Sequence, residues 1–301
     1  FCGQTDIVRS LREHCAGAIA KNIPLPHTNL QGPSGSGKTT LAECVAKERG
    51  TECHPFYCSC GTKRWQLAKH LAKVNACDVV FLDEAHSLED GVQEVAYEAI
   101  DHLRVHEVDD EKKRIVENTW KDIKPFAMIV ATDQSGKLKN AFLRRLTLSY
   151  TLTRYTVDEM RLVVSNRAAE LGVLLSPQAV TRFAEASGGL PRRARQLLQS
   201  LHTCLLDPRV TITKPMADCH LESLGIDDDN LTSDQRRYLR TLAARTGMVG
   251  IVTISIALGL DEITLRREVE AELIHKGLID IQRGRTLTAA GRAYVAQRRL
   301  V

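Results

Sequence analysis

Residues 32–39 read Gly-Pro-Ser-Gly-Ser-Gly-Lys-Thr, and their types and spacing suit the binding of phosphate. The order of Gly32, four residues, Gly37, Lys38 and Thr39 is the P-loop pattern. Glycines let the backbone turn tightly and point N–H groups at phosphate oxygens. Lys38 would bring a positive charge to the β- and γ-phosphates, and the Thr39 hydroxyl can ligate Mg²⁺. The predicted phosphate-binding residues are Gly32, Pro33, Ser34, Gly35, Ser36, Gly37, Lys38, Thr39 and Thr40.

A strand and a helix must hold this loop in position. Residues Thr28–Gln31 predict the strand that leads into it. Residues Thr40–Glu48 predict a helix whose N-terminus directs the positive end of its dipole at the anion. A plain Gly/Ser-rich turn is the alternative interpretation, and the strand before the loop and the helix after it disfavour that alternative.

A second motif supplies carboxylates. The apolar run Cys77–Glu84 ends in Asp83 and Glu84, which is typical of a buried parallel strand whose carboxyl end faces a ligand crevice. Asp83 would organise Mg²⁺ through water, and Glu84 would polarise the attacking water as general base. Paired acids at a strand end can also be helix-capping residues, but the P-loop upstream favours the catalytic interpretation.

Two further runs complete the predicted sheet. The apolar run Pro125–Thr132 predicts a strand, and Asp133 follows it. A polar side chain at this strand end would lie between the two motifs and contact the γ-phosphate or the water. Residues Arg145–Thr153 alternate apolar and polar side chains, as a further strand would. Strands that alternate with helical stretches indicate an α/β fold with a parallel, helix-covered sheet.

The rest of the chain predicts two smaller domains. Helical spacing dominates after residue 153, and three consecutive aspartates within Gly225–Asn230 mark another boundary. A helix-turn-helix pattern at 252–275 then precedes a β-wing, and such winged helices bind duplex DNA or a protein. We predict a large P-loop domain at 1–153, a helical lid at 154–224 and a winged helix at 225–301.

Composition narrows the class of protein. The 301 residues carry a formal net charge of +4, which is too small to indicate nucleic-acid binding by itself. No apolar run approaches the roughly 20 residues that cross a bilayer, so we expect no membrane partner. With no secretory signal, we expect a cytoplasmic protein with free thiols. Residues 281–301 contain no acidic residue, which suits an anionic partner or a solvated helix, and their arginines are Arg283, Arg285, Arg292, Arg298 and Arg299.

One group among the nine cysteines has residue types that suit zinc. Its members are Cys53, His54, Cys58 and Cys60. Their spacing is not that of a common zinc module, and a plain strand and loop is the favoured alternative.

In this order, the motifs resemble those of the RuvB-type AAA+ ATPases, the family of Holliday-junction branch-migration motors. The resemblance extends along the chain through both motifs, Gly189-Leu-Pro-Arg192 and the winged helix with Arg283-Gly-Arg285. It implies an ATP-hydrolysing motor that acts on duplex or four-way junction DNA in recombination and repair, with ATP and Mg²⁺ as cofactors. It also implies a hexameric ring and a RuvA-like junction-binding partner.

The resemblance assigns roles to single residues as well. Arg192 corresponds to the sensor-2 arginine, which reports nucleotide state to the lid. Arg145 corresponds to the arginine finger, which reaches the γ-phosphate of the next subunit, although a solvated surface arginine is the alternative. The wing arginines Arg283 and Arg285 correspond to DNA contacts. The further residues implied to bind the cofactor are Ile7, Tyr155 and Pro191.

The chain departs from the family pattern at several positions, among them the sensor-1 residue and the partner-docking hairpin. The sensor-1 residue of the family is Thr or Asn, and Asp133 aligns with it, so Thr132 and Asp133 are both candidates. A third carboxylate near the γ-phosphate would be repulsive unless it is protonated or metal-bound. The partner-docking hairpin corresponds to His102–Lys121, which is almost wholly charged or polar. Two alternatives therefore stay open: an ATP-gated loader or switch that does not translocate, and a DNA-binding scaffold without ATPase activity.

Overall fold

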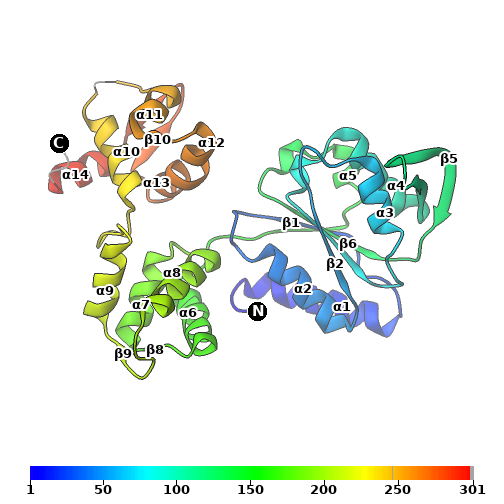
Figure 1. The fold of residues 1–301 in the computed structure, drawn as a ribbon, viewed down its shortest axis with the longest axis horizontal. Helices are drawn as coiled ribbons and strands as arrows, with labels where there is room; N and C mark the ends of the chain where they lie inside the picture. Colours follow the sequence, from blue (N-terminus) through cyan, green and yellow to red (C-terminus); the bar gives the residue numbers. More distant parts are fainter. Residues whose placement is uncertain (246, 299–301) are drawn as a thin grey trace. The chain divides into compact units, whose positions relative to one another are not determined.

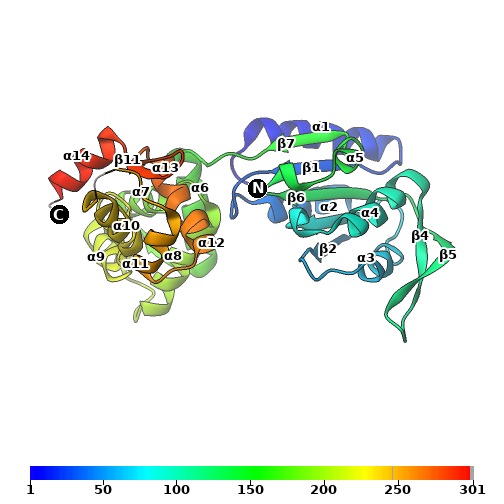
Figure 2. The same cartoon turned by 90° about the horizontal axis from the view of Figure 1, so that it is seen from above.

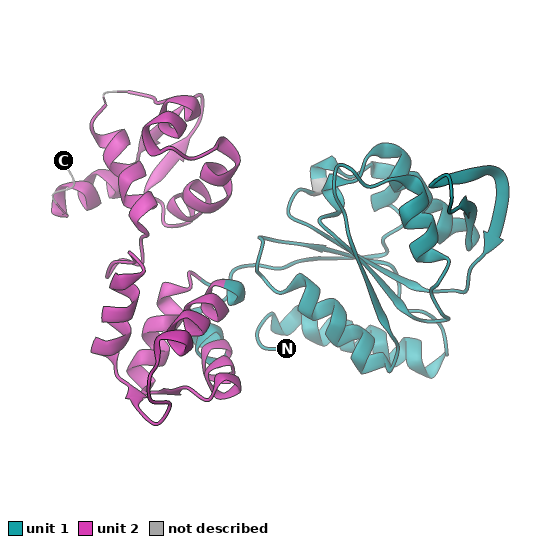
Figure 3. Ribbon diagram, viewed as in Figure 1, with its two compact units in different colours: residues 1–162, 189–192 teal, residues 163–188, 193–301 magenta. Residues whose placement is uncertain are grey.

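The computed structural model describes residues 1–245 and 247–298, which form two compact units (Figure 3). Unit 1 comprises residues 1–162 and 189–192, and unit 2 comprises residues 163–188 and the chain from residue 193 onward. Arg299, one of the arginines noted above, lies outside the described residues. The division into domains at 1–153, 154–224 and 225–301 stays a prediction.

Unit 1 is built on a parallel sheet of five strands in the order β2-β3-β6-β1-β7 (Figure 1). Every strand of this sheet that was predicted from the sequence is present, with ends shifted by a few residues. The strands are β1 (Thr28–Gln31), β2 (Cys53–Tyr57), β3 (Val79–Asp83), β6 (Ala127–Thr132) and β7 (Leu148–Thr151).

Helices cover both faces of this sheet (Figure 2). On one face α1 (Thr5–Ala20) and α2 (Lys38–Arg49) pack on β3 side chains such as Phe81. On the other face α3 (Arg64–Leu71) and α4 (Asp90–His102) pack on alternate side chains such as Leu82. Because both faces are buried, the central strands are continuous apolar runs, as the sequence indicated.

A two-stranded hairpin extends from unit 1 (Figures 1 and 2). Its strands are β4 (Arg104–Asp109) and β5 (Arg114–Asp122), which pair antiparallel. Trp120 stacks on His106 with ring centroids 3.9 Å apart, and the Arg104 guanidinium lies 4.3 Å from the Trp120 ring. The hairpin is therefore ordered near its base by aromatic packing, while charged residues occupy its turn. Short helical segments elsewhere in this unit are η1 (Ala85–Ser87), η2 (Ser135–Lys137) and α5 (Asn140–Leu143).

The helical part that follows begins with α6 (Val157–Leu171), in the stretch where helical spacing was predicted. Ser176 and Pro177 start the helix α7 (Pro177–Ala186), and the Ser176 hydroxyl accepts a hydrogen bond from the Ala179 N–H at 3.3 Å. The remaining elements are β8 (Leu174–Leu175), α8 (Pro191–Cys204), β9 (Thr211–Ile212) and α9 (Lys214–Ser223).

A winged helix closes the described chain. Its core gathers Tyr238, Leu239, Ile254, Leu265 and Leu273, all fully buried. The predicted second helix is divided into α12 (Glu262–Thr264), a π-helical segment η3 (Leu265–Glu270) and α13 (Ala271–His275). The other elements are α10 (Ser233–Ala243), α11 (Ile251–Leu258), β10 (Ile279–Ile281), β11 (Arg285–Leu287) and α14 (Ala289–Gln297).

The acidic segment Gly225–Asn230 is tied to its neighbours within unit 2. Asp227 accepts a hydrogen bond from Tyr294 at 3.0 Å and forms an ion pair with Arg236 at 3.1 Å. Arg182 of α7 reaches the Asp227 carbonyl at 3.1 Å and also bonds Asn230. Residues that precede the acidic segment and residues that follow it therefore both contact it. None of the described helices is both long and apolar enough to span a bilayer.

Candidate active site

The carboxyl ends of β1, β3 and β6 bring the predicted motifs to one edge of the sheet. Asp83 ends β3, Thr132 ends β6, and the P-loop follows β1. Gln31 lies opposite Thr132 in the register, and the Gly32 N–H donates a hydrogen bond to the Thr132 carbonyl at 3.2 Å. Ligands of parallel sheets bind outside the carboxyl ends of the strands. The fold therefore brings the predicted motifs together at the place where a ligand would bind.

The glycines of the loop occupy conformations that side chains do not tolerate. Gly35 and Gly37 have φ angles of 80° and 100°. A Cβ atom at Gly35 would lie 2.8 Å from the Arg192 Cβ, and one at Gly32 would lie 2.6 Å from the Leu152 carbonyl oxygen. The loop can therefore be built only with glycine at these positions.

Lys38 is held beneath the loop. Its side chain is buried, and its ammonium donates hydrogen bonds to the carbonyls of Gly32 at 2.8 Å and Pro33 at 3.1 Å. Burial lowers the pKa of Lys38, and the carboxylates of Glu84, Asp83 and Asp133 act in the opposite direction. A partly desolvated ammonium at a loop of this kind suits an anion better than a neutral ligand.

The residues of the loop fit a phosphate group and a cation. The Ser36 hydroxyl is buried and has no hydrogen-bond partner in the described part of the chain. The Thr39 hydroxyl lies 3.5 Å from an Asp83 carboxylate oxygen, whose second oxygen accepts the Glu84 N–H at 3.0 Å. A hydroxyl and a carboxylate beside a phosphate site are the oxygen ligands that Mg²⁺ uses, with water filling the remaining positions.

His86 lies between the second motif and the end of β6. Its Nε2 is 3.4 Å from a Glu84 carboxylate oxygen, and its Nδ1 is 3.3 Å from both an Asp133 oxygen and the Thr132 hydroxyl. Only 4% of the His86 side chain is exposed, against 20% for Asp133 and 37% for Glu84. The third carboxylate of the site is therefore paired with an imidazole. No role was predicted for His86, although it completes the run Asp-Glu-Ala-His at residues 83–86.

Three other predicted cofactor residues surround the loop. The Arg192 N–H donates to the Gly35 carbonyl at 3.3 Å, and its guanidinium reaches the Ser34 hydroxyl at 3.5 Å. The Tyr155 hydroxyl lies 3.4 Å from the position that a Cβ of Gly37 would occupy. Pro191 begins α8 directly before Arg192. These three residues are thus gathered around one end of the P-loop.

Ile7 and Phe1 differ in their contacts, since one packs on the apolar core and the other lies at the loop. Ile7, predicted to bind the cofactor, packs on the apolar core between α1 and the sheet. The Phe1 ring, which the sequence analysis did not assign, lies 3.2 Å from the position of a Cβ at Gly37. Phe1 is thus a contact of the P-loop that no motif pointed to.

Arg145 has its own carboxylate partner. Its Nε and Nη2 form a bidentate pair with Asp101, with Nε 2.8 Å from both oxygens. Its Nη1 bonds the Ala141 carbonyl at 2.5 Å, and the guanidinium lies 4.5 Å from the Tyr97 ring. The arginine and Asp101 stay 29% and 31% exposed. Part of the guanidinium edge therefore stays open to solvent.

Arg285 differs from the prediction. It was expected to contact DNA from the wing, but its guanidinium pairs with Glu270 in the core at 2.9 and 3.3 Å. The two side chains are only 9% and 3% exposed, and Tyr238 donates a further hydrogen bond to Glu270 at 2.6 Å. A buried carboxylate needs a positive partner, and Arg285 supplies it. The structure thus gives Arg285 a partner in the core and leaves Arg283 exposed, and the DNA contact of Arg285 stays a prediction.

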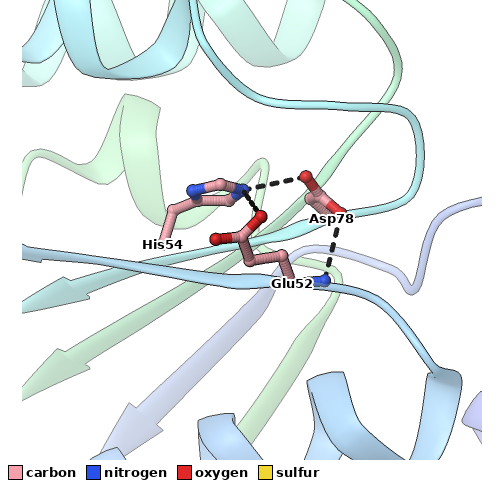
Figure 4. A group of neighbouring side chains, drawn as sticks. All are labelled: Glu52, His54 and Asp78. Carbon is pink, nitrogen blue, oxygen red and sulfur yellow. Dashed lines mark hydrogen bonds and ion pairs between the residues drawn. The ribbon is translucent and has the colours of Figure 1, made fainter.

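The zinc-type group is not assembled. Cys53 and Cys58 pack in the cores on opposite faces of the sheet, and Cys60 is exposed. Burial raises the pKa of Cys58 to about 12, which disfavours a thiolate ligand. His54 instead lies 2.8 Å from Asp78 and 4.0 Å from Glu52 (Figure 4). No disulfide joins any of the nine cysteines, all of which lie in the described part of the chain.

The His54 contact has a structural explanation. Asp78 also accepts the backbone N–H groups of Asn75 at 3.0 Å and Glu52 at 3.1 Å. Burial of Asp78 acts to raise its pKa, but these hydrogen bonds and the one to His54 outweigh burial and lower it. The contact therefore fastens the beginning of β2 to the beginning of β3, at the edge of the sheet opposite the P-loop.

Comparison with known proteins agrees with this geometry. Residues 1–152 match the model of the Holliday junction DNA helicase RuvB P-loop domain, and residues 229–296 match the RuvB C-terminal winged helix domain. The chain belongs to the RuvB family. It is therefore an AAA+ ATPase with a parallel-sheet P-loop domain, a helical region and a winged helix, as the resemblance predicted.

RuvB proteins are similar to this chain along almost its whole length. The Holliday junction branch migration complex subunit RuvB of Gluconobacter oxydans is 32% identical over 295 residues, which cover 97% of this chain and 84% of the relative. That of a Wolbachia strain from Brugia malayi is 31% identical and covers 98% and 91%. The structure of the Thermotoga maritima RuvB Holliday junction branch migration motor has a TM-score of 0.84 and 29% identity, with 98% and 95% of the chains covered.

Proposed function

We propose that the chain is an ATP-hydrolysing motor on duplex DNA that drives the branch migration of Holliday junctions in recombination and repair. The observation that carries this proposal is the convergence of Lys38, Thr39, Asp83 and Glu84 at one sheet edge. The family membership, which extends to the winged helix, supports DNA as the object of the cycle.

Each residue of the site has a distinct task in this proposal. Lys38 and the N–H groups of the loop hold the phosphates of ATP. Thr39 and Asp83 hold Mg²⁺, which neutralises developing phosphate charge when bound. Glu84 accepts a proton from the attacking water. Arg192 bonds the loop through Ser34 and Gly35, which would let it sense a nucleotide bound there.

A ring of identical subunits, a hexamer, completes the site. Arg145 contacts Asp101, Ala141 and Tyr97 in its own chain, and its open edge supports a reach to the γ-phosphate bound by the neighbour. A RuvA-like protein would dock on the β4–β5 hairpin, and the motor would work in the cytoplasm. Exposed Arg283 on the wing would contact DNA phosphates.

ATP turnover with and without four-way junction DNA tests this proposal. We expect junction DNA to stimulate turnover. Lys38→Ala should abolish turnover through lost nucleotide binding, and Glu84→Gln should bind ATP without hydrolysing it. Normal turnover in Glu84→Gln would contradict the assignment of the base.

A second candidate is an ATP-gated loader or switch that binds a protein through the winged helix. Apolar side chains on its surface favour this alternative, since Met248, Val252 and Ile256 are 58%, 57% and 78% exposed. The pairing of buried Arg285 with Glu270 also weakens the support for one of the two predicted DNA contacts. Turnover that is indifferent to DNA would support the switch, and absence of turnover would support a scaffold.

A further inference from the structure

The contact of His86 with two carboxylates goes beyond the tasks assigned above. We propose that Asp133 is a positioning residue that acts through His86 on Glu84, and that it does not contact the γ-phosphate. This inference rests on the proposed function, in which Glu84 is the base. It concerns a residue at which the chain carries a carboxylate where an uncharged sensor-1 side chain was expected.

The geometry joins the three side chains in a row. Both ring nitrogens of His86 face a carboxylate, at 3.4 Å for Glu84 and 3.3 Å for Asp133. Because the ring is almost completely buried, it has little freedom to turn away from either one. An ordered imidazole therefore connects the end of β6 to the residue that follows β3.

Among the residues that the structure describes, His86 is the ion-pair partner of the Asp133 carboxylate. Its Oδ1 is buried and forms no hydrogen bond within the described residues, and His86 lies within ion-pair distance of it. Leaving a buried carboxylate oxygen unpaired is costly, so the His86 contact offsets that cost. The charge of Asp133 acts to raise the pKa of Lys38, but the hydrogen bonds of Lys38 go to the carbonyls of Gly32 and Pro33.

Glu84 is the least enclosed member of the row. Glu84 has a φ of 54°, in the left-handed region, and begins the short segment η1 that carries His86. Its side chain is the most exposed of the three. The more buried pair, His86 and Asp133, can thus hold the Glu84 carboxylate in one orientation. Fixing a general base in this way acts on the rate of the chemical step and not on nucleotide binding.

Pairing with His86 would also reduce the electrostatic repulsion between the Asp133 carboxylate and the γ-phosphate. The Asp133 oxygen lies beside the His86 imidazole, and imidazole is a group that can carry positive charge. A direct phosphate contact would make Asp133 oppose ATP binding, and its neutralisation would then strengthen that binding. The two roles therefore predict different changes in KM and kcat.

The experiment is a double-mutant cycle of Asp133→Asn and His86→Ala in the full chain. The measured quantities are kcat and KM for ATP and the Kd of a fluorescent ATP analogue. We expect Asp133→Asn to lower kcat about tenfold, as loss of a supporting outer partner does at other sites, with KM and Kd unchanged. In the His86→Ala background, Asp133→Asn should change kcat no further.

Three results would overturn the inference. They are an unchanged kcat in Asp133→Asn, a tighter Kd for the analogue in that variant, and a full tenfold effect that persists without His86. Asp90→Asn, which removes an exposed carboxylate paired with Lys139, is the matched control and should leave all three quantities unchanged. His86→Gln, which keeps polar groups at the ring position, should recover part of the His86→Ala loss. Wild-type chain without any turnover would instead refute the proposed function itself.

Discussion

Arg145 and Arg285 were both predicted to bind a phosphate outside their own fold, and the structure treats them differently. Each pairs with one carboxylate, Asp101 for Arg145 and Glu270 for Arg285. The first pair lies at the surface with Tyr97 beside it, and the second lies in the winged-helix core with Tyr238. The burial of the partner carboxylate, and not the motif around the arginine, decides whether the guanidinium is available.

The energetics of the two pairs follow from that difference. Glu270 is buried and would be very costly to leave unpaired, so Arg285 is held in the core. Asp101 is partly exposed, and its hydrogen bond with Arg145 lowers the pKa of its carboxyl. The surface pair contributes little to stability but fixes the orientation of a planar group with further N–H donors. Arg145 is thus oriented at the surface with donors left over, whereas Arg285 neutralises a carboxylate inside its own domain.

Removal of Arg145 should have the largest effect. We expect Arg145→Ala to lower kcat about 10³-fold while ATP still binds, because an arginine finger stabilises charge that develops in the transition state. Mixing this variant with Lys38→Ala chains should restore part of the turnover, since each variant supplies the half-site that the other lacks. A mixture as inactive as its components would show that Arg145 does not act across subunits.

Removal of Arg285 should affect stability and leave nucleotide binding unchanged. Arg285→Met should lower the free energy of unfolding of the winged helix by about 3–5 kcal/mol, because it leaves Glu270 buried without a counter-charge. Denaturant unfolding measures the change, and the double variant with Glu270→Leu should recover most of it. Full stability with weakened DNA binding would restore Arg285 as a DNA contact.

Loss of the Asp101 charge should have a smaller effect on turnover. We expect Asp101→Asn to lower kcat about tenfold, since Arg145 keeps its charge but loses the carboxylate that orients it. Because the pKa of Asp101 is lowered, the pair stabilises the fold above the unfolded pKa and is lost as pH falls through the folded pKa. Thermal unfolding over an acid series should show that this step is missing in the variant.

The matched control for Asp101 is an exposed ion pair. Asp158 pairs with Arg161 one helical turn away, at 3.1 Å, and its side chain is 87% exposed. Asp158→Asn should change neither kcat nor the acid dependence, as surface pairs of this kind contribute little. Equal effects of both variants would mean that Asp101 has no special relation to Arg145.

The sequence was sufficient for the features that depend on local pattern. Buried parallel strands leave continuous apolar runs, and the P-loop has a unique spacing, so β1, β3 and β6 and the residues at their ends could be predicted. The contact of His86 with Asp133 could not be predicted in this way. The two residues follow different strands and meet only because β3 and β6 are neighbours in the sheet.

The burial of Arg285 could not be predicted from the sequence for a different physical reason. An α-helical period places Leu265, Val269 and Leu273 on one face, and it does not assign Glu270 to the core. The segment η3 is π-helical, and its i→i+5 hydrogen bonding adds a residue to the turn, so that Glu270 falls on the face of Leu265. Packing decides the formation of such a turn, and the buried charge then requires Arg285.

The smallest predicted effect belongs to Arg283, the wing arginine that stays exposed. Arg283→Ala should reduce DNA affinity a few-fold on any sequence and reduce the slope of log K against log salt by about 0.9 per lost phosphate contact. Binding titrations at several salt concentrations measure both. Arg209→Ala, which removes an exposed arginine outside the winged helix, is the control and should leave the slope unchanged. An unchanged slope in Arg283→Ala would leave neither wing arginine in contact with DNA, and the exposed apolar side chains of α11 would then favour a protein as the partner of this domain.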